Sequence, residues 1–226
     1  MRRIKIGILS NYDFKDYIKL LCSEDNYNKY EFVLIEYPNP EISFDGLVVL
    51  NEPKTNFILN LNSDFVISFH QEPGNFLLQP FMFFNLKQYK KVYSPLRISN
   101  VNTSLPFLPW HIKKNYKQLS EKVLYNKNKK LSLISSNKKT LKGHKQRLKF
   151  VGRLKKERIE CDFFGKGTKF IEDKLEGLSN YKYSIVIENS KKPNYFTEKI
   201  TDCFLANTVP IYYGCTKIYD FFPKNS

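Results

Sequence analysis

Long apolar runs, paired cysteines and a leader-like N-terminus are all missing from this 226-residue sequence. No stretch reaches the roughly 18 consecutive apolar residues of a transmembrane helix. The N-terminus, MRRIKIGILSNYDF, lacks the long apolar region and the small-residue cleavage site of a secretory signal peptide. The four cysteines lie far apart without CxxC spacing, which argues against a metal site and a disulfide framework. These absences predict a cytoplasmic, reducing location.

Acidic residues are scarce in the second half of the chain. Residues 1–104 carry 11 Lys and Arg and 11 Asp and Glu, whereas residues 105–226 carry 26 and 11 and account for the whole net charge of +15. This asymmetry predicts an anionic partner for the second half. A lysine-rich face that only keeps the protein in solution is one alternative, and binding of nucleic acid or acidic polysaccharide through residues 113–158 is another. Peripheral binding to an anionic membrane also stays open.

Strand-like and helix-like segments alternate along the first half. Hydrophobic residues make up 42% of the chain, which is enough for a packed core. Alternation of this kind predicts an α/β fold with a parallel sheet, and ligands of such sheets bind at the carboxyl ends of the strands. The expected strands are 4–9, 31–37, 45–50, 64–69 and 92–94, and the expected helices are 14–22 and 57–61.

Two prolines in LPFLPWH (residues 105–111) interrupt this pattern where the charge changes. We therefore expect two domains, residues 1–108 and 109–226. The second domain repeats the alternation. Its expected strands are 130–135, 159–164, 183–187 and 209–213, and its expected helices are 113–124, 144–154 and 197–206. The sequence stops at FFPKNS, where a second α/β domain would normally continue into further helices, so truncation of the C-terminal part is expected.

The segment YSIVIENSKKPNYFTEK (residues 183–199) predicts a binding site. The strand ends at Glu188 and Asn189, and the next helix begins near Thr197, a residue that caps helix N-termini well. The unpaired amides of that first turn and the charge of Lys199 favour an anion, and Glu198 can accept hydrogen bonds from sugar hydroxyls. A phosphorylated, hydroxyl-rich ligand is one interpretation; an ordinary connection with an acidic first turn is the other.

A second strand end, SSNKKTLKGHKQR (residues 135–147), has the same character. Asn137 and Lys138 lie in a loop rich in hydrogen-bond donors, and a helix opens just before Arg147. The planar guanidinium of arginine can grip a diphosphate, which a lysine cannot do in the same way. A basic surface helix is the alternative, and it is our interpretation for Lys145 and Lys149.

The stretch YSIVIENSKKPNYFTEKITDCFLANTVPIYYG resembles the signature of the α-1,3-fucosyltransferases of glycosyltransferase family 10. The segment SSNKKTLKGHKQRLKFVGRL and the later FGKG also resemble the family's donor domain, so that the likeness covers about residues 130–222. It implies two Rossmann-like domains facing across a cleft (GT-B type), with residues 1–108 on the acceptor side. It also implies transfer of L-fucose from GDP-fucose to a glycan hydroxyl with inversion.

The resemblance assigns roles to residues of this chain. Arg147 and Lys199 would neutralise the diphosphate. Glu198 and Tyr195 would contact the guanosine or the fucose. Glu188 and Asn189 would line the donor pocket, to which we also assign Asn137 and Lys138. Some family members have Gly before the tyrosine, where this chain has Pro193–Asn194, so the loop could differ in shape.

The catalytic base is expected in the first domain. An inverting transfer needs a carboxylate or a histidine that accepts the proton of the acceptor hydroxyl. Glu72 follows the strand DFVISF in HQEPGN and is the first choice, His70 is the second, and Glu52 is the third. No DxD metal motif is present, so no obligatory metal is expected, while a stimulatory divalent cation stays open. The expected partners are a nucleotide sugar and a glycan, not nucleic acid; a different nucleotide sugar is the closest alternative.

Overall fold

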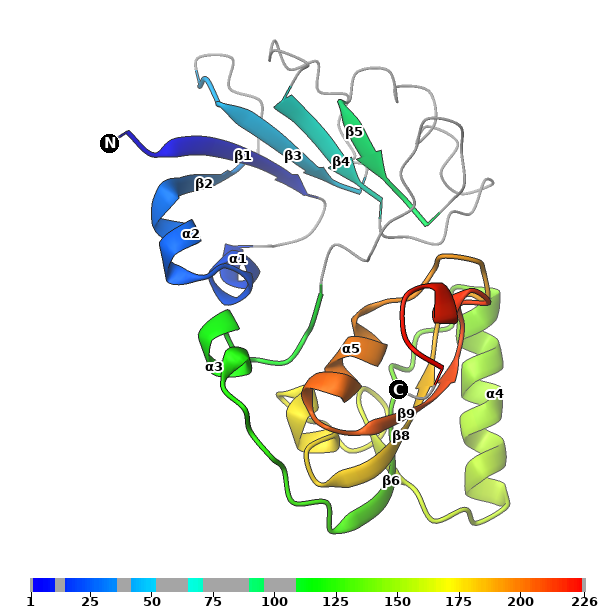
Figure 1. Cartoon of the computed structure of the whole chain (residues 1–226). Helices are drawn as coiled ribbons and strands as arrows, with labels where there is room; N and C mark the ends of the chain where they lie inside the picture. The colour runs from blue at the N-terminus through cyan, green and yellow to red at the C-terminus, as the bar shows by residue number, and fades with distance from the viewer. Residues whose placement is uncertain are drawn as a thin grey trace. The chain divides into compact units, whose positions relative to one another are not determined.

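The computed structural model describes residues 2–10, 15–35, 42–51, 65–70, 90–95 and 109–224. The chain divides into two compact units. One unit comprises Met1–Phe107 with Asn115–Gln118, and the other comprises Leu108–Lys114 with Leu119–Ser226. Each unit contains its own parallel sheet, as the alternation of strand-like and helix-like segments predicted (Figure 1).

The first unit carries five described strands in the order β2-β1-β3-β4-β5, all parallel. Because β1 leads to β2 on one side while β3 continues on the other, the strand order reverses between β1 and β3. The bounds are β1 Ile4–Ser10, β2 Tyr30–Leu34, β3 Gly46–Leu50, β4 Val66–Phe69 and β5 Lys91–Tyr93, with helices α1 Lys15–Leu21 and α2 Glu24–Lys29 between β1 and β2.

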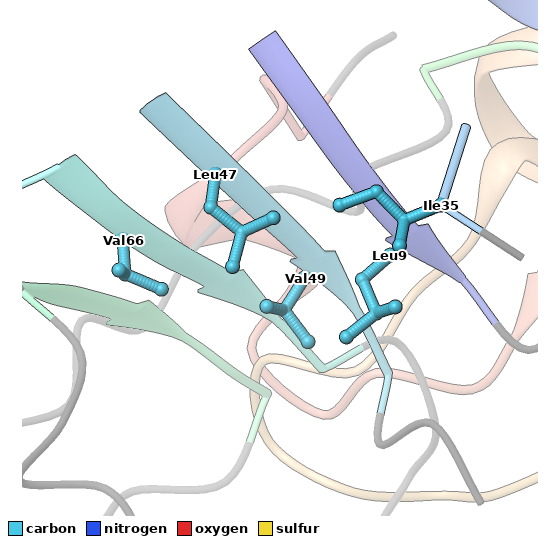
Figure 2. Packing of buried hydrophobic residues seen from close by; sticks show 5 residues of the cluster. All are labelled: Leu9, Ile35, Leu47, Val49 and Val66. Carbon is cyan, nitrogen blue, oxygen red and sulfur yellow. The ribbon is translucent and has the colours of Figure 1, made fainter. Parts of the chain in front are cut away.

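Aliphatic side chains from neighbouring strands form the core of this sheet (Figure 2). Five buried side chains make up this core, each at most 9% exposed. Full burial of such a side chain stabilises the folded state by about 1.5–3 kcal/mol. Four of the five residues of β3 are buried, and they point to both faces of the sheet. Burial on both faces is typical of a parallel sheet. The five residues are Leu9, Ile35, Leu47, Val49 and Val66.

The second unit has four strands in the order β7-β6-β8-β9, again all parallel. Helix α4 leads outward from β6 to β7, and α5 leads outward from β8 to β9, on opposite sides of the sheet (Figure 1). The order therefore reverses between β6 and β8, the position where open α/β sheets bind ligands. The bounds are β6 Lys129–Ile134, α4 Lys142–Lys156, β7 Asp162–Phe164, β8 Tyr181–Ile187, α5 Glu198–Leu205 and β9 Val209–Tyr213.

Helix α5 is held at both ends and along one face. Thr197 is its N-cap, as predicted, and Asn207 follows it with φ 53°, the left-handed conformation that ends many helices. Cys203 packs with Val186 of β8 in a cluster of residues that are at most 4% exposed. This packing fixes where the first turn of α5 lies relative to the end of β8.

Two expected elements are shorter in the structure. The helix expected over residues 113–124 is only α3, Tyr116–Ser120, which buries no side chain and therefore has no core against which to extend. The strand expected over 159–164 begins only at Asp162. Two 3-10 helices, η4 Lys174–Gly177 and η5 Ile218–Asp220, had no signal in the sequence pattern. The helix expected over 57–61 lies outside the described residues.

Among the helices within the described ranges, none is both long and apolar enough to cross a bilayer.

Candidate functional site

Arg147 joins the carboxyl ends of β6 and β8. From the second turn of α4, its Nη1 donates to Asn189 Oδ1 at 2.7 Å, and its Nη2 donates to Ser136 Oγ at 3.0 Å and to the Ser136 carbonyl at 3.3 Å. Gly143, in the first turn of α4, packs directly on the Asn189 backbone, where a Cβ would overlap the carbonyl group. The loops at the reversal of strand order are thus locked to α4.

The charge of Arg147 is surrounded by neutral partners. The residue is only 4% exposed, and no carboxylate of the described residues lies within ion-pair distance of it. The Nε atom of Arg147 is buried, and no described residue forms a hydrogen bond with it. Burial lowers the pKa of Arg147, and the nearby charge of Glu188 acts in the opposite direction. A buried cation held by neutral oxygens favours an anion, because the energetic cost of its desolvation is not offset.

Glu188 organises the start of α5. Its side chain is fully buried. Oε1 accepts the Thr197 backbone N–H at 2.8 Å, Oε2 lies 2.8 Å from the Lys199 ammonium, and the Thr197 hydroxyl lies 2.9 Å from Oε2. Gly214, at the end of β9, leaves the room, since a Cβ there would overlap the Glu188 side chain. Glu188 therefore fixes both the N-cap and the position of the Lys199 ammonium, which is also 2.7 Å from Thr197 Oγ1.

Glu198, the next acidic residue, faces a different cation. Its Oε1 lies 2.8 Å from the Lys174 ammonium of η4 and 4.0 Å from His111 Nδ1. Burial alone would raise the pKa of Glu198, but the charges of Lys174 and Lys199 outweigh it and hold that pKa below its ordinary range. Glu198 is therefore ionised at neutral pH, and its side chain remains 19% exposed.

Asp202 completes this cluster from one turn further along α5. Its carboxylate is fully buried; Oδ2 lies 2.8 Å from Lys174 Nζ, and Oδ1 accepts the His111 backbone N–H at 2.7 Å. The Thr201 hydroxyl donates to the Pro109 carbonyl. The segment that enters the second unit is thereby fastened to α5.

Tyr195 and the residue before it belong to the same connection. Tyr195 is 3% exposed and lies between Asn194 and the buried Phe196. Asn194 has φ 60°, a left-handed conformation that glycine adopts freely and that asparagine tolerates better than most residues. The departure from Gly at this position therefore keeps a backbone conformation suited to glycine.

Asn137 and Lys138 lie exposed in the loop after β6. Gly167, with φ 93°, approaches this loop so closely that a Cβ would lie 3.1 Å from Asn137 Cβ. The first glycine of FGKG, Gly165, has φ 105° and packs on the Ser135 carbonyl. The FGKG turn thus supports the loop that carries both predicted residues.

The base predictions fall mostly on residues that the structure does not describe. Glu72 and Glu52 lie outside the described residues. His70, the second choice, is 6% exposed, and its Nε2 lies 3.1 Å from Ser68 Oγ. Burial lowers the pKa of His70 to about 4, so the imidazole is neutral at pH 7. Its Nδ1 is buried and has no hydrogen-bond partner within the described ranges.

Sequence reasoning missed the partners that hold these side chains. Lys174, Asp202 and Ser136 make the contacts described above. Lys174 lies outside the two motifs, and Asp202 and Ser136 lie within them but were assigned no role. One signal was available, because Asp202 follows Glu198 by four residues and so lies on the same face of α5. The described residues contain no group of three or more His, Cys, Asp or Glu that could hold a metal ion.

A family model describes the same part of the chain. The C-terminal domain of glycosyltransferase family 10, the fucosyltransferases, matches residues 124–226. The likeness to this family therefore covers a little under half of the chain. The family 10 domain includes every described residue of the predicted donor set.

Curated relatives agree with this assignment over short stretches. An alpha-(1,3)-fucosyltransferase of Helicobacter pylori is 41% identical over 56 residues, which are 24% of this chain and 12% of that protein. Alpha-(1,3)-fucosyltransferase B of Drosophila melanogaster is 43% identical over 51 residues, 23% of this chain and 12% of that protein. The matched segments thus span about an eighth of each relative's length.

A solved structure resembles the whole chain. The crystal structure of an alpha1,3-fucosyltransferase with GDP-fucose aligns with 99% of this chain and 72% of its own, with a TM-score of 0.56 and 19% sequence identity. At this identity the likeness shows the fold alone, and the fold of this chain is α/β with parallel sheets.

Proposed function

We propose that this protein transfers L-fucose from GDP-fucose to a hydroxyl of a glycan acceptor, with inversion at the anomeric carbon. The observation that carries the proposal is the arrangement at the reversal of strand order, where Arg147, Lys199 and the first turn of α5 lie at the ends of β6 and β8. A family whose members are named fucosyltransferases matches these same residues. The related structure with GDP-fucose supports the choice of donor.

The proposed donor site uses the cations for the diphosphate. Arg147 and Lys199 would stabilise the negative charge that develops on the β-phosphate when the bond to fucose breaks. Among the described residues the Lys199 ammonium has two partners, Glu188 and Thr197, which leaves one N–H for a phosphate oxygen. Asn137, Lys138, Asn189 and Tyr195 complete the proposed donor set, with Glu198 as an acceptor for a sugar hydroxyl.

The proposed mechanism needs a base from residues 1–108, the proposed acceptor-side domain of a GT-B enzyme. The acceptor oxygen attacks the anomeric carbon, its proton passes to Glu72, and GDP leaves. No bound metal enters this scheme, because the cations of the protein carry the charge stabilisation. The α-1,3 linkage is the regiochemistry that the named relatives suggest.

Titration calorimetry tests the donor. GDP-fucose and GDP should bind with micromolar affinity, whereas GDP-mannose, UDP-sugars and an oligonucleotide should bind more weakly or not at all. Salt-sensitive binding of the oligonucleotide without any response to GDP would refute the proposal and favour a basic nucleic-acid-binding protein.

The Glu72→Gln substitution tests the base. We expect turnover to fall by about 100-fold or more, because general base catalysis typically contributes that much, while the affinity for GDP stays near that of the wild type. Glu52→Gln, the matched control, should retain turnover. Full activity of Glu72→Gln would show that another group accepts the proton, with His70 as the next candidate.

A further inference from the structure

Lys174 lies between two carboxylates of α5 and outside the donor set proposed above. Its ammonium is 2.8 Å from Glu198 Oε1 and 2.8 Å from Asp202 Oδ2. The side chain of Lys174 is 22% exposed, and that of Asp202 is fully buried. Since Glu198 and Asp202 are one helical turn apart, both face η4, and a single cation serves both.

The two carboxylates differ in how many of their oxygens the protein uses. Asp202 has both oxygens engaged, one by Lys174 and one by the backbone N–H of His111. Glu198 has only Oε1 engaged; no residue of the described segments donates a hydrogen bond to Oε2. A fully buried Oε2 without a donor would be a buried unsatisfied atom, and Oε2 is not one. Oε2 is therefore in contact with solvent.

We propose that Lys174 is a positioning residue, which fixes Glu198 as an ionised acceptor for a hydroxyl of the donor's ribose or fucose. The inference rests on the proposed use of GDP-fucose and adds a residue to that site. An ionised carboxylate with one oxygen held and the other open is a directional acceptor for a hydroxyl group. Lys174 supplies both conditions, since it holds Oε1 and keeps the carboxyl charged.

The charges around Glu198 give this role a measurable signature. Lys174 faces it from η4, His111 from the segment before α3, and Asp202 and Lys199 from α5 itself. Burial and the charge of Lys174 lower the pKa of His111, so it is neutral near pH 7. Without Lys174, burial would raise the pKa of Glu198 and only the charge of Lys199 would oppose it strongly, so that pKa would be higher than in the wild type. Protonation of His111 at low pH would act in the opposite direction.

Donor titrations of Lys174→Met at pH 8 and pH 5.5 test the proposal. We expect the affinity for GDP-fucose to fall by about 10-fold at pH 8, the value of one hydrogen bond to a charged group, and further at pH 5.5 as Glu198 takes up a proton. The wild type should change little between the two pH values. Lys174→Arg keeps a cation that can reach both carboxylates and should recover most of the affinity.

A second variant separates positioning from folding. Lys174→Met leaves Asp202 as a buried charge without its cation, which can unfold the protein. Lys174→Met with Asp202→Asn removes that charge and keeps an acceptor for the His111 N–H, so its melting temperature should approach that of the wild type. The double variant should still bind GDP-fucose weakly and with the new pH dependence; wild-type binding by it would refute the positioning role.

A matched control comes from the other end of the same sheet. Lys129 is the first residue of β6 and pairs with Asp162 at 2.9 Å, away from the carboxyl edge, so Lys129→Met should leave donor binding unchanged. Comparison of GDP with GDP-fucose locates the hydroxyl: equal losses indicate the ribose, and a loss confined to GDP-fucose indicates the sugar. Absence of GDP-fucose binding by the wild type would refute the proposed function as well, whereas normal wild-type binding with an unchanged Lys174→Met refutes only the positioning role.

Discussion

Two largely buried cations stand on either side of the β6–β8 junction, and they are held in opposite ways. Arg147 has neutral oxygens as its partners, from Ser136 and Asn189. Lys174 lies between two carboxylates, Glu198 and Asp202. A cation surrounded by acids is already neutralised, whereas a cation surrounded by neutral groups retains attraction for an anion. From this difference we propose that an anion binds on the Arg147 side and a hydroxyl group on the Glu198 side.

Removal of Arg147 should have the largest effect on this comparison. We expect Arg147→Ala to weaken GDP binding by about 100-fold, because it removes the charge and also frees the loops at Ser136 and Asn189. Arg147→Lys should recover only part of the loss, since a lysine lacks the planar fork that reaches both loops. Calorimetry with GDP checks both variants. Lys145→Ala, an exposed residue of the same helix, is the control and should bind GDP as the wild type does.

An equal affinity of Arg147→Ala and wild type for GDP would remove the distinction between the two cations. The buried guanidinium would then be a structural clamp between the ends of β6 and β8.

The sequence predicted most strands of both sheets because each is short, apolar and bounded by turn residues. The strand 183–187 and the helix 197–206 both lie within two residues of their observed bounds, and Thr197 caps α5 as its residue type predicts. Strand-end logic also placed Glu188 and Arg147 at the same edge of the sheet. These features depend on local pattern, which a single sequence contains.

Contacts between distant segments could not be predicted in the same way. Lys174 lies in η4 with no motif around it. It contacts Glu198, 24 positions later in the chain, because the fold brings η4 next to α5. The burial of Glu188 depends on Gly214, at the far end of β9. Such pairings follow from strand order, and the sequence pattern alone leaves several strand orders open.

Close packing at the start of α4 should give the next largest effect. Gly143 lies against the Asn189 backbone, so a methyl group there must push the helix and the β8–α5 connection apart. We expect Gly143→Ala to lower the free energy of unfolding by about 1–3 kcal/mol, and also to weaken GDP binding because Arg147 and Asn189 separate. Thermal denaturation and calorimetry measure the two effects.

Gly152, in the same helix, is the matched control for that substitution. It has open space around it, so Gly152→Ala should stabilise α4 by the difference in helix propensity and leave GDP binding alone. Equal melting temperatures of Gly143→Ala and wild type would contradict the close approach at Asn189.

The smallest expected effect, on stability and donor binding, comes from Asn194 in the connection between β8 and α5. Asn194 has φ 60°, so a residue with a Cβ and no local hydrogen bonding should be strained there by about 1 kcal/mol. Asn194→Ala should therefore lower the melting temperature, whereas Asn194→Gly should stay within about 0.5 kcal/mol of the wild type. Because Tyr195 and Thr197 follow directly, Asn194→Ala should also weaken GDP-fucose binding slightly, while Asn194→Gly preserves it. A lower stability of Asn194→Gly than of Asn194→Ala would show that the asparagine side chain, and not the backbone conformation, holds this loop.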